Sequence, residues 1–350
     1  MGVGARIAYM KAKKTIHLMF WPVIPISAGK EAHAARAILA LALFWSCSLA
    51  AQVGQPNDSG QAPPPGGAEP NVIPANALVS QTGREERLSG SVSYSYVAPG
   101  NASFPGATGG NSGAQSVTVG VLGSLPVNER WFIPLGLGWG NVLLNAVPGE
   151  PVPEQINGLR LLAGLGCKIN EQWTVAATAG PALYRFEDIQ GDDIGAGGIV
   201  RAVYRPRRDL TVLFGFGVNP DSVYPVLPLA GVRWDVSTNL TLNLMFPKSG
   251  VIYRVAPRLS LYAGADFKFA VFRSDNDLGN QIGQPRFNNA LATYQDIHLG
   301  VGAEYRIIRG LSVSLEGGYS VGRSIHYKDL DETVKFDPSP YVQAGVRCWF

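Results

Sequence analysis

Residues 259–269 read LSLYAGADFKF, and apolar side chains occupy every second position of this stretch. The apolar positions are Leu259, Leu261, Ala263, Ala265, Phe267 and Phe269. Small, polar or charged residues stand between most of them, including Gly264, Asp266 and Lys268. Because successive side chains of a β-strand point to opposite faces, the pattern predicts a strand with one apolar and one polar face.

The same period of two recurs from residue 87 to the end of the chain. It predicts strands at 87–97, 114–124, 130–140, 157–168, 172–183, 194–205, 210–218, 226–235, 239–246, 250–256, 259–272, 292–307, 311–322 and 339–350. Connections after even-numbered strands are short, such as PVNER and PRRD, whereas most of those after odd-numbered strands are long, such as 98–113 and 323–338. This alternation is typical of outer-membrane barrels. We therefore predict an all-β fold, a transmembrane antiparallel up-and-down β-barrel of about 14 strands. The short connection FPKS (246–249) leaves about 12 strands as an alternative.

The composition excludes several other classes of protein. The chain of 350 residues has 42 glycines and 25 prolines, which excludes a coiled coil. Mean hydropathy is +0.07, yet no apolar run long enough for a transmembrane helix, roughly 20 residues, follows Ala51. A soluble sandwich would need a charge-rich second face, whereas only 16% of the residues are charged and glycine and serine fill much of that face.

The N-terminal sequence predicts export. Residues 1–50 combine a long basic flank with an apolar core at 37–45 and a small-residue stretch, which is typical of a signal peptide. Residues 51–86 are rich in proline and glycine and predict a flexible periplasmic linker, so that the barrel spans 87–350. A membrane anchor and a lipoprotein at Cys47 are alternatives that the short core and the bulky residues before the cysteine disfavour. The predicted location is the bacterial outer membrane, reached through the periplasm.

The formal charge of +3 is a property of the export segment and not of the barrel. Residues 1–50 contain six basic residues and one acidic residue, a net +5, so the rest of the chain has a net charge of −2. The remainder therefore has no global basic field, and we expect no nucleic-acid partner.

Aromatic residues mark the predicted membrane boundaries. Trp131 and Trp139 lie on one face of a predicted strand, separated by roughly 20 Å across the bilayer, and Trp173 and Trp234 lie near short turns. We expect these four residues to form part of an aromatic girdle in contact with outer-membrane lipid and lipopolysaccharide. The C-terminal Phe350 ends an alternating last strand, which predicts a signal that barrel-assembly machinery recognises.

Two kinds of motif suggest chemistry, but one lacks the required structural context and the other lacks part of its ligand set. Residues 318–322 match G-x-S-x-G, but they fall within an alternating strand and not in the strand–turn–helix of a nucleophile elbow. Residues 275–279 and 187–193 resemble fragments of calcium loops without the full ligand spacing. We therefore predict no enzymatic activity, no metal site and no cofactor, with a lipid-active enzyme as an unfavoured alternative.

The inward face of the predicted barrel is charged, and nine basic residues outnumber five acidic ones. The main candidates are Arg160, Arg201, Arg233, Arg254, Asp266, Lys268, Asp296, Glu304, Glu316 and Arg347. Because rings of arginine and lysine select anions in pores, one hypothesis is a passive pore with a weakly basic lumen for small anionic solutes. The alternative is a structural or adhesive barrel with no transport activity, whose lumen is filled by ion pairs because buried charges require partners.

The stretch VLPLAGVRWDVSTNLTLNLMFPKSGVIYRVAPRLSLYAGADFKFA (226–270) resembles a bacterial family of uncharacterised outer-membrane β-barrel proteins, a domain of unknown function. The resemblance covers 87–350 and is sharpest in the quoted stretch. It implies the same barrel fold, and it implies no ligand, reaction or site residue.

Overall fold

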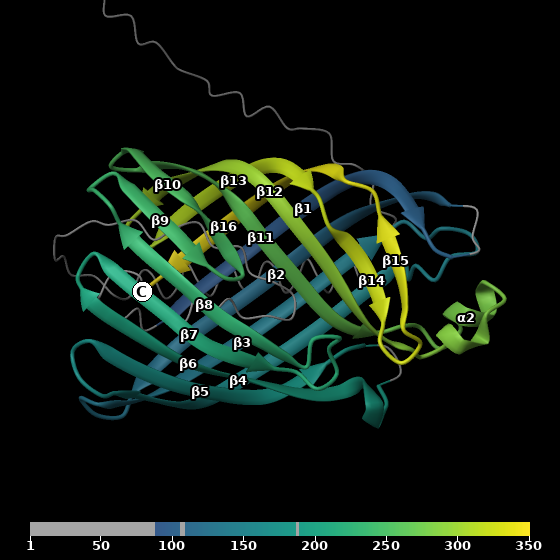
Figure 1. Ribbon diagram of the computed structural model, residues 1–350, viewed down its shortest axis with the longest axis horizontal. Helices are drawn as coiled ribbons and strands as arrows, with labels where there is room; N and C mark the ends of the chain where they lie inside the picture. Colours follow the sequence, from purple (N-terminus) through teal and green to yellow (C-terminus); the bar gives the residue numbers. More distant parts are fainter. Residues whose placement is uncertain (1–87, 106–108, 187–188) are drawn as a thin grey trace, which may run out of the picture. The chain divides into compact units, whose positions relative to one another are not determined.

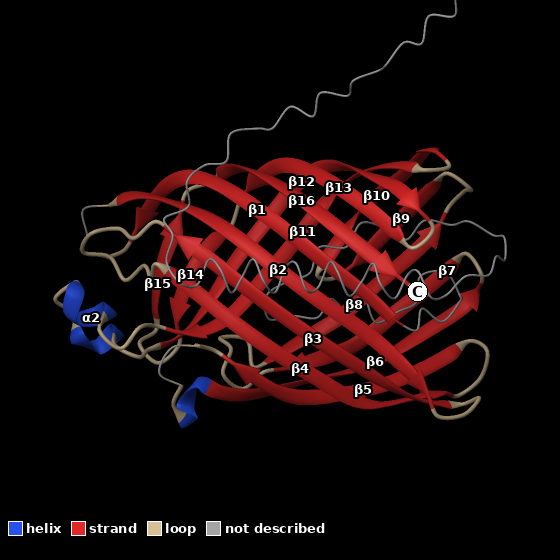
Figure 2. Cartoon of the chain, turned by 180° about the vertical axis from the view of Figure 1, so that it is seen from behind, coloured by secondary structure: helices blue, strands red, loops and turns tan. Residues whose placement is uncertain are grey.

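The computed structural model describes residues 88–105, 109–186 and 189–350, and almost all of its regular structure is β-strand (Figures 1 and 2). The predicted signal peptide (1–50) and linker (51–86) lie outside the described residues. The strands are β1 (Leu88–Ser103), β2 (Gly110–Pro126), β3 (Trp131–Leu144), β4 (Gln155–Lys168), β5 (Trp173–Leu183), β6 (Ile194–Arg207), β7 (Leu210–Val218), β8 (Val226–Asp235), β9 (Leu240–Met245), β10 (Lys248–Ala256), β11 (Leu259–Arg273), β12 (Leu291–Ile308), β13 (Leu311–Ser320), β14 (Arg323–Tyr327), β15 (Glu332–Phe336) and β16 (Ser339–Trp349).

Three short helices complete the described structure. They are the 3-10 helices η1 (Gly191–Asp193) and η2 (Pro285–Phe287) and the α-helix α2 (Leu278–Gln281). None of the helices in the described part of the chain is long and apolar enough to cross a membrane.

Fourteen of the sixteen strands form one closed antiparallel barrel. Each strand from β1 to β12 pairs with the next, β13 pairs with β16, and β16 pairs with β1, which closes the ring. The remaining two strands, β14 and β15, form a hairpin that continues the sheet beyond β13 and β16 by pairing with β12 and β1. The predicted fold class is confirmed with 14 strands, because β9 and β10 are both present despite the short turn between them.

The hairpin β14–β15 corrects one sequence-based expectation. Residues 323–338 read as a long loop, whereas two strands of five residues each lie inside this segment. Their alternation is too short to stand out from chance in the sequence. In the structure their apolar residues Ile325, Tyr327, Val334 and Phe336 are all buried, and this packing explains why the segment is ordered as a hairpin.

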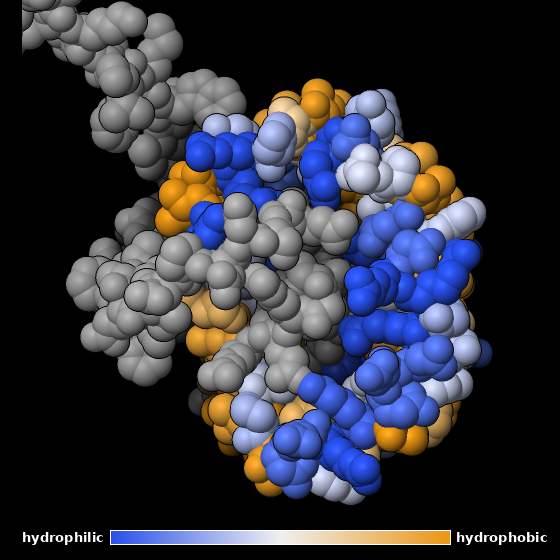
Figure 3. Space-filling view, turned by 90° about the vertical axis from the view of Figure 1, so that its left-hand side faces the viewer, coloured by the Kyte–Doolittle hydropathy of each residue, from blue (hydrophilic) through white to orange (hydrophobic). Residues whose placement is uncertain are grey.

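The barrel is apolar outside and largely polar inside. Every barrel strand except β5 has at least one exposed large apolar side chain, such as Leu161, Leu244, Val301 and Leu315. Viewed from the end with the short turns, hydrophilic residues gather on the rim and hydrophobic residues lie at its periphery (Figure 3). So much exposed apolar surface is unfavourable in water and is typical of strands that face lipid.

Candidate functional site

The predicted inward-facing charges lie on barrel strands at positions that alternate with outward-facing residues. Arg160 lies on β4, Arg201 on β6, Arg233 on β8, Arg254 on β10, Asp266 and Lys268 on β11, Asp296 and Glu304 on β12, Glu316 on β13 and Arg347 on β16. The four acidic residues are all 3–6% exposed. They gather on the adjacent strands β11 to β13, whereas the arginines are spread around the ring. The lumen therefore has one acidic wall.

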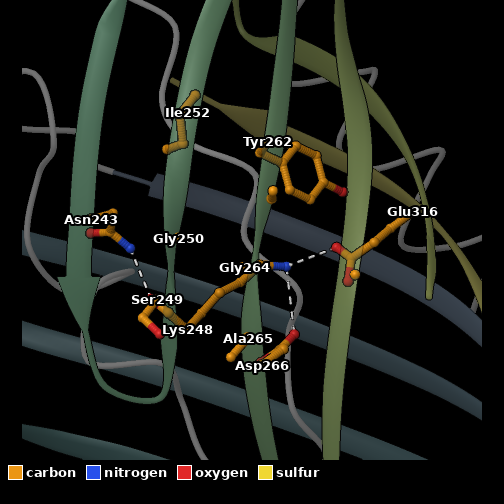
Figure 4. Close-up of a pocket in the computed structure, with 12 residues that line it drawn as sticks. Asn243, Lys248, Ser249, Gly250, Ile252, Tyr262, Gly264, Ala265, Asp266 and Glu316 are labelled. Carbon is orange, nitrogen blue, oxygen red and sulfur yellow. Dashed lines mark hydrogen bonds and ion pairs between the residues drawn. The ribbon is translucent and has the colours of Figure 1, made fainter. Parts of the chain in front are cut away.

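Lys248 joins two of these acids (Figure 4). Its Nζ lies 3.5 Å from Asp266 Oδ2 and 3.3 Å from Glu316 Oε2. The side chains of the two acids are 5% and 6% exposed, and that of Lys248 is 14% exposed. Sequence reasoning missed Lys248 because FPKS reads as a connection, whereas this residue is the first of β10. The three side chains form a buried ion cluster with one more negative than positive charge.

Two tyrosines complete the surroundings of Glu316. The hydroxyl of Tyr341 donates a hydrogen bond to Glu316 Oε1, and the hydroxyl of Tyr262 also points toward this carboxylate. Both rings lie over inward-facing glycines of β12. A Cβ at Gly302 would lie 2.4 Å from Tyr262 Cζ, and a Cβ at Gly300 would lie 2.1 Å from the Tyr341 hydroxyl. These glycines therefore provide the space in which the tyrosines lie flat against the wall.

Asp296 is the centre of a second buried group. It accepts hydrogen bonds from Ser320 Oγ at 2.5 Å and from the Tyr294 hydroxyl at 3.1 Å, and His298 Nε2 lies 2.9 Å from its Oδ2. Ser320 is the serine of the G-x-S-x-G match and lies at the end of a strand. In a catalytic triad the histidine stands between serine and acid. Here the acid stands between the other two, so Ser320 donates its hydrogen bond to the Asp296 carboxylate and not to the imidazole of His298.

The other sequence candidates for chemistry show no ligand arrangement. Within residues 88–105, 109–186 and 189–350, no group of three or more histidine, cysteine, aspartate or glutamate side chains is placed to hold a metal ion. Residues 275–279 lie at the start of α2. Part of the other fragment, Glu187 and Asp188, falls outside the described residues.

Several lumen guanidinium groups have donors without partners. Buried nitrogens that make no hydrogen bond include Nε and Nη2 of Arg160, Nε of Arg254, and Nε and Nη2 of Arg306. By contrast, Arg201, Arg233 and Arg347 each have an interaction partner. Three of the four acids of the wall, Asp266, Asp296 and Glu316, have partners, whereas the buried Glu304 Oε2 makes no hydrogen bond. Part of the basic charge likewise has no hydrogen-bond partner.

Part of the inward face is apolar, against the expectation of glycine and serine. Seven buried residues from β2, β4 and β6 to β9 form one cluster, namely Leu122, Leu162, Ile199, Val203, Leu213, Leu229 and Met245. The expectation was wrong for these strands because β6 and β7 have apolar residues on both faces, as at Leu213 and Phe214. Only the structure distinguishes the buried face from the exposed one.

Long connections cover the mouth at the opposite end from the short turns (Figure 1). Their buried apolar residues pack with those of the strand ends and the β14–β15 hairpin in one cluster, which we call the loop cap. Its loop and hairpin members are Phe104, Val147, Val152, Phe287, Ile325, Tyr327, Val334 and Phe336. The ring of Phe287 lies 5.8 Å from that of Phe104 and 4.8 Å from that of Tyr327. Tyr327 also donates a hydrogen bond to the Pro151 carbonyl, so the loop cap joins loops that are distant in sequence.

Two acids in the cap connections have perturbed acidity. Burial raises the pKa of the Glu150 carboxyl above its ordinary value, and neither of its oxygens has a hydrogen-bond partner. Burial, followed by repulsion from Asp277, raises the pKa of Asp275. Both carboxyl groups are therefore weaker acids while the loop cap is packed.

The aromatic candidates lie mainly at the short-turn end. Trp131, Trp173 and Trp234 each stand next to a short turn, and Trp131 and Trp234 are 41% and 40% exposed. Trp173 stacks on the outward-facing Tyr204 with ring centroids 4.5 Å apart, whereas Trp139 lies within β3, eight residues beyond Trp131. This placement tests neither the girdle nor its lipid contacts, which stay predictions.

The C-terminal Phe350 follows β16, and its backbone N–H donates a hydrogen bond to the carbonyl of Leu88. The last residue is thereby attached to the start of β1 at the seam of the barrel. Its role as an assembly signal stays a prediction.

These features define a class: a 14-stranded transmembrane β-barrel with a charged lumen and a covered mouth. Within this class, the chain belongs to the family described as a domain of unknown function (DUF6268), which matches residues 127–348.

Solved structures share only a distant likeness. A FadL homologue from Pseudomonas aeruginosa matches with 12% identity over 80% of this chain and 94% of its own, at a TM-score of 0.43. An outer membrane channel from Pseudomonas putida F1 matches with 12% identity over 80% and 100%, also at 0.43. The toluene transporter TodX from Pseudomonas putida matches with 11% identity over 81% and 96%, at 0.37. None of the curated proteins that were compared matches the chain.

Proposed function

We propose that this chain is a bacterial outer-membrane barrel that passively transports small anionic solutes through its lumen. The observation that supports this function best is the set of unpaired guanidinium donors on Arg160, Arg254 and Arg306. A buried cationic donor without a partner is costly, and a passing anion relieves that cost. Arginine rings select anions in pores for the same reason.

The outer membrane is the location that suits this surface. A closed antiparallel barrel pairs its strands on both sides over most of their length, and its apolar exterior meets the hydrocarbon. In this proposal the outward face contacts outer-membrane lipid and lipopolysaccharide, the tryptophans form the girdle, and barrel-assembly machinery recognises Phe350. The loop cap must move for solutes to pass.

Conductance across a planar bilayer tests the transport function. In a gradient of KCl we expect a reversal potential of the sign for anion selectivity, and we expect the double variant Arg254→Ser/Arg306→Ser to reduce it. The exposed turn residue Arg130 provides the control, because Arg130→Ser should leave the reversal potential unchanged.

The loop cap provides a second variant for the same experiment. Phe287 is fully buried in the cap, and Phe287→Ala should raise the open probability by weakening the packing over the mouth. Cation selectivity, or no conductance from either the unaltered chain or Phe287→Ala, would overturn the transport function.

A structural or adhesive barrel is the second candidate. The observation that favours it is the loop cap itself, since an apolar cluster of this size stabilises a closed mouth. A barrel that stays non-conducting after Phe287→Ala and keeps its thermal stability would support this candidate.

A further inference from the structure

The barrel wall has a gap above the turn between β9 and β10. β9 pairs only with residues 231–235 of β8, and β10 reaches only to Asp266 of β11. Beyond these points β8 and β11 continue without a strand between them, as the short β9–β10 hairpin shows (Figure 1). In the described chain no backbone pairing joins the outer parts of β8 and β11.

The outer part of β11 leans across the lumen toward β4 and β5. β4 and β11 are in contact although β5 to β10 lie between them in the sheet. The N–H of Arg273 points to the carbonyl of Tyr184 at 3.5 Å, and Val271 packs with Ala182 and Tyr184. The outer part of β11 thereby separates a side pocket from the main lumen.

The side pocket lies between β6 to β8 and the outer part of β11. Its apolar lining includes Ile199, Leu227, Leu229, Phe269 and Val271. Its space, including the part open to solvent, is about 670 Å³. Tyr224 of the β7–β8 loop contacts Phe269, with ring centroids 6.2 Å apart, at the side of the gap.

Among the residues that the structure describes, Arg160 is the only charged one that lines this pocket. It is 6% exposed, and its Nε and Nη2 have no hydrogen-bond partner. The group lies over Gly197, where an added Cβ would be 3.3 Å from Nη2. The nearby Asp221 carboxylate accepts a hydrogen bond from Tyr184 at 2.8 Å. The pocket therefore presents one buried cation without a bonded acid.

The free edge of Arg160 fits a carboxylate. Nε–H and Nη2–H are the two parallel donors with which a guanidinium binds both oxygens of a carboxylate. A single guanidinium balances one negative charge, so a dianionic phosphate would leave a charge uncompensated among apolar side chains. The remaining lining suits an apolar body.

We propose that the side pocket binds a monocarboxylate with an apolar chain, whose head pairs with Arg160 and whose chain lies along Leu229 and Phe269 toward the gap in the wall. This binding does not depend on conduction through the lumen, so it can fail or succeed independently of the transport function.

Calorimetry of the full chain in phosphatidylcholine nanodiscs tests the site, with octanoate as the probe. We expect saturable binding by the unaltered chain and at least a tenfold weaker affinity for Arg160→Met. Arg130→Met is the control, because Arg130 is an exposed residue of a short turn and does not line the side pocket, so that octanoate affinity should be unchanged. Octanamide, which has the same chain without charge, should bind at least tenfold more weakly than octanoate.

Two further variants keep the test decisive if Arg160→Met does not fold. Leu229→Trp fills the pocket and should abolish octanoate binding, and Arg160→Lys keeps the charge without the paired donors and should weaken it several-fold. Unchanged affinity in the folded Arg160 variants, equal affinity for octanamide, or no saturable binding by the unaltered chain would overturn the site. Stronger binding of octyl phosphate than of octanoate would overturn the choice of a monocarboxylate.

Discussion

Replacing Lys248 by methionine should destabilise the barrel strongly. The substitution keeps the length of the side chain and removes the cation that contacts both Asp266 and Glu316. The two carboxylates would then lie close together, both buried, without their shared counter-charge. Lys248 lies in the segment FPKS, which reads as a connection in the sequence, and only the fold brings it to the two acids.

The distances give the size of the effect. At 3.3 and 3.5 Å, and with an effective dielectric constant of about 20, each ion pair contributes about 5 kcal/mol of attraction. Burial of the ammonium offsets several kcal/mol of this gain. Removing one partner of a buried pair typically costs about 3–5 kcal/mol, and we expect the free energy of unfolding to fall by that amount.

Equilibrium unfolding in urea, followed by tryptophan fluorescence in lipid vesicles, measures this loss. Lys335→Met, at an exposed position of β15, is the control and should change stability little. The triple variant Lys248→Met/Asp266→Asn/Glu316→Gln removes all three charges and should recover most of the lost stability. A loss below about 1 kcal/mol for Lys248→Met, or a triple variant as unstable as the single one, would refute the reasoning.

Two further predictions concern packing and pH. Gly302→Ala should lower the free energy of unfolding in urea by about 1–3 kcal/mol, because its Cβ would meet the Tyr262 ring at 2.4 Å. Gly317→Ala is the control, since its Cβ has only an ordinary contact at 3.6 Å. Equal losses for the two variants would contradict the prediction. Because the pKa values of Glu150 and Asp275 are raised above 4.5 and 3.8, the packed loop cap binds protons that the open cap releases, so its stability falls as pH rises through the raised values. Hydrogen exchange of cap amides, corrected for the intrinsic rate, should show more opening at neutral than at acid pH, and a double Glu150→Gln/Asp275→Asn variant that keeps the full pH dependence would contradict this assignment.

The strands were predictable because lipid imposes one simple rule on them. A residue that faces hydrocarbon must be apolar, so the period of two persists along each strand, and the predicted ranges 210–218 and 226–235 coincide with β7 and β8. Pairing is then nearly determined, since consecutive strands with short turns form hairpins. For these reasons the number of strands and the order of the barrel followed from the sequence.

The contacts inside the lumen were less predictable because they depend on registers accumulated over several strands. The alternation of side chains along each strand places Asp266 and Glu316 on the inward face. They meet at Lys248 only because the registers of β10, β11, β12 and β13 bring the three residues to the same height. No local sequence pattern encodes this combined register. The loop cap was missed for a related reason, because isolated apolar residues such as Phe287 have no period to indicate their burial.

Arg160 shows why an unpaired charge inside a barrel is informative. Its neighbours on β4 and β6 are mostly apolar or glycine, so methionine at this position would fill similar space without a buried cation. Since removing an uncompensated buried charge usually stabilises a fold, Arg160→Met should raise the unfolding temperature of the empty barrel. A ligand carboxylate reverses this balance, because it provides the missing partner and adds its binding free energy to the folded state. Octanoate should therefore stabilise the unaltered chain and leave Arg160→Met nearly unaffected, and equal stabilisation of both would show that octanoate acts elsewhere on the barrel.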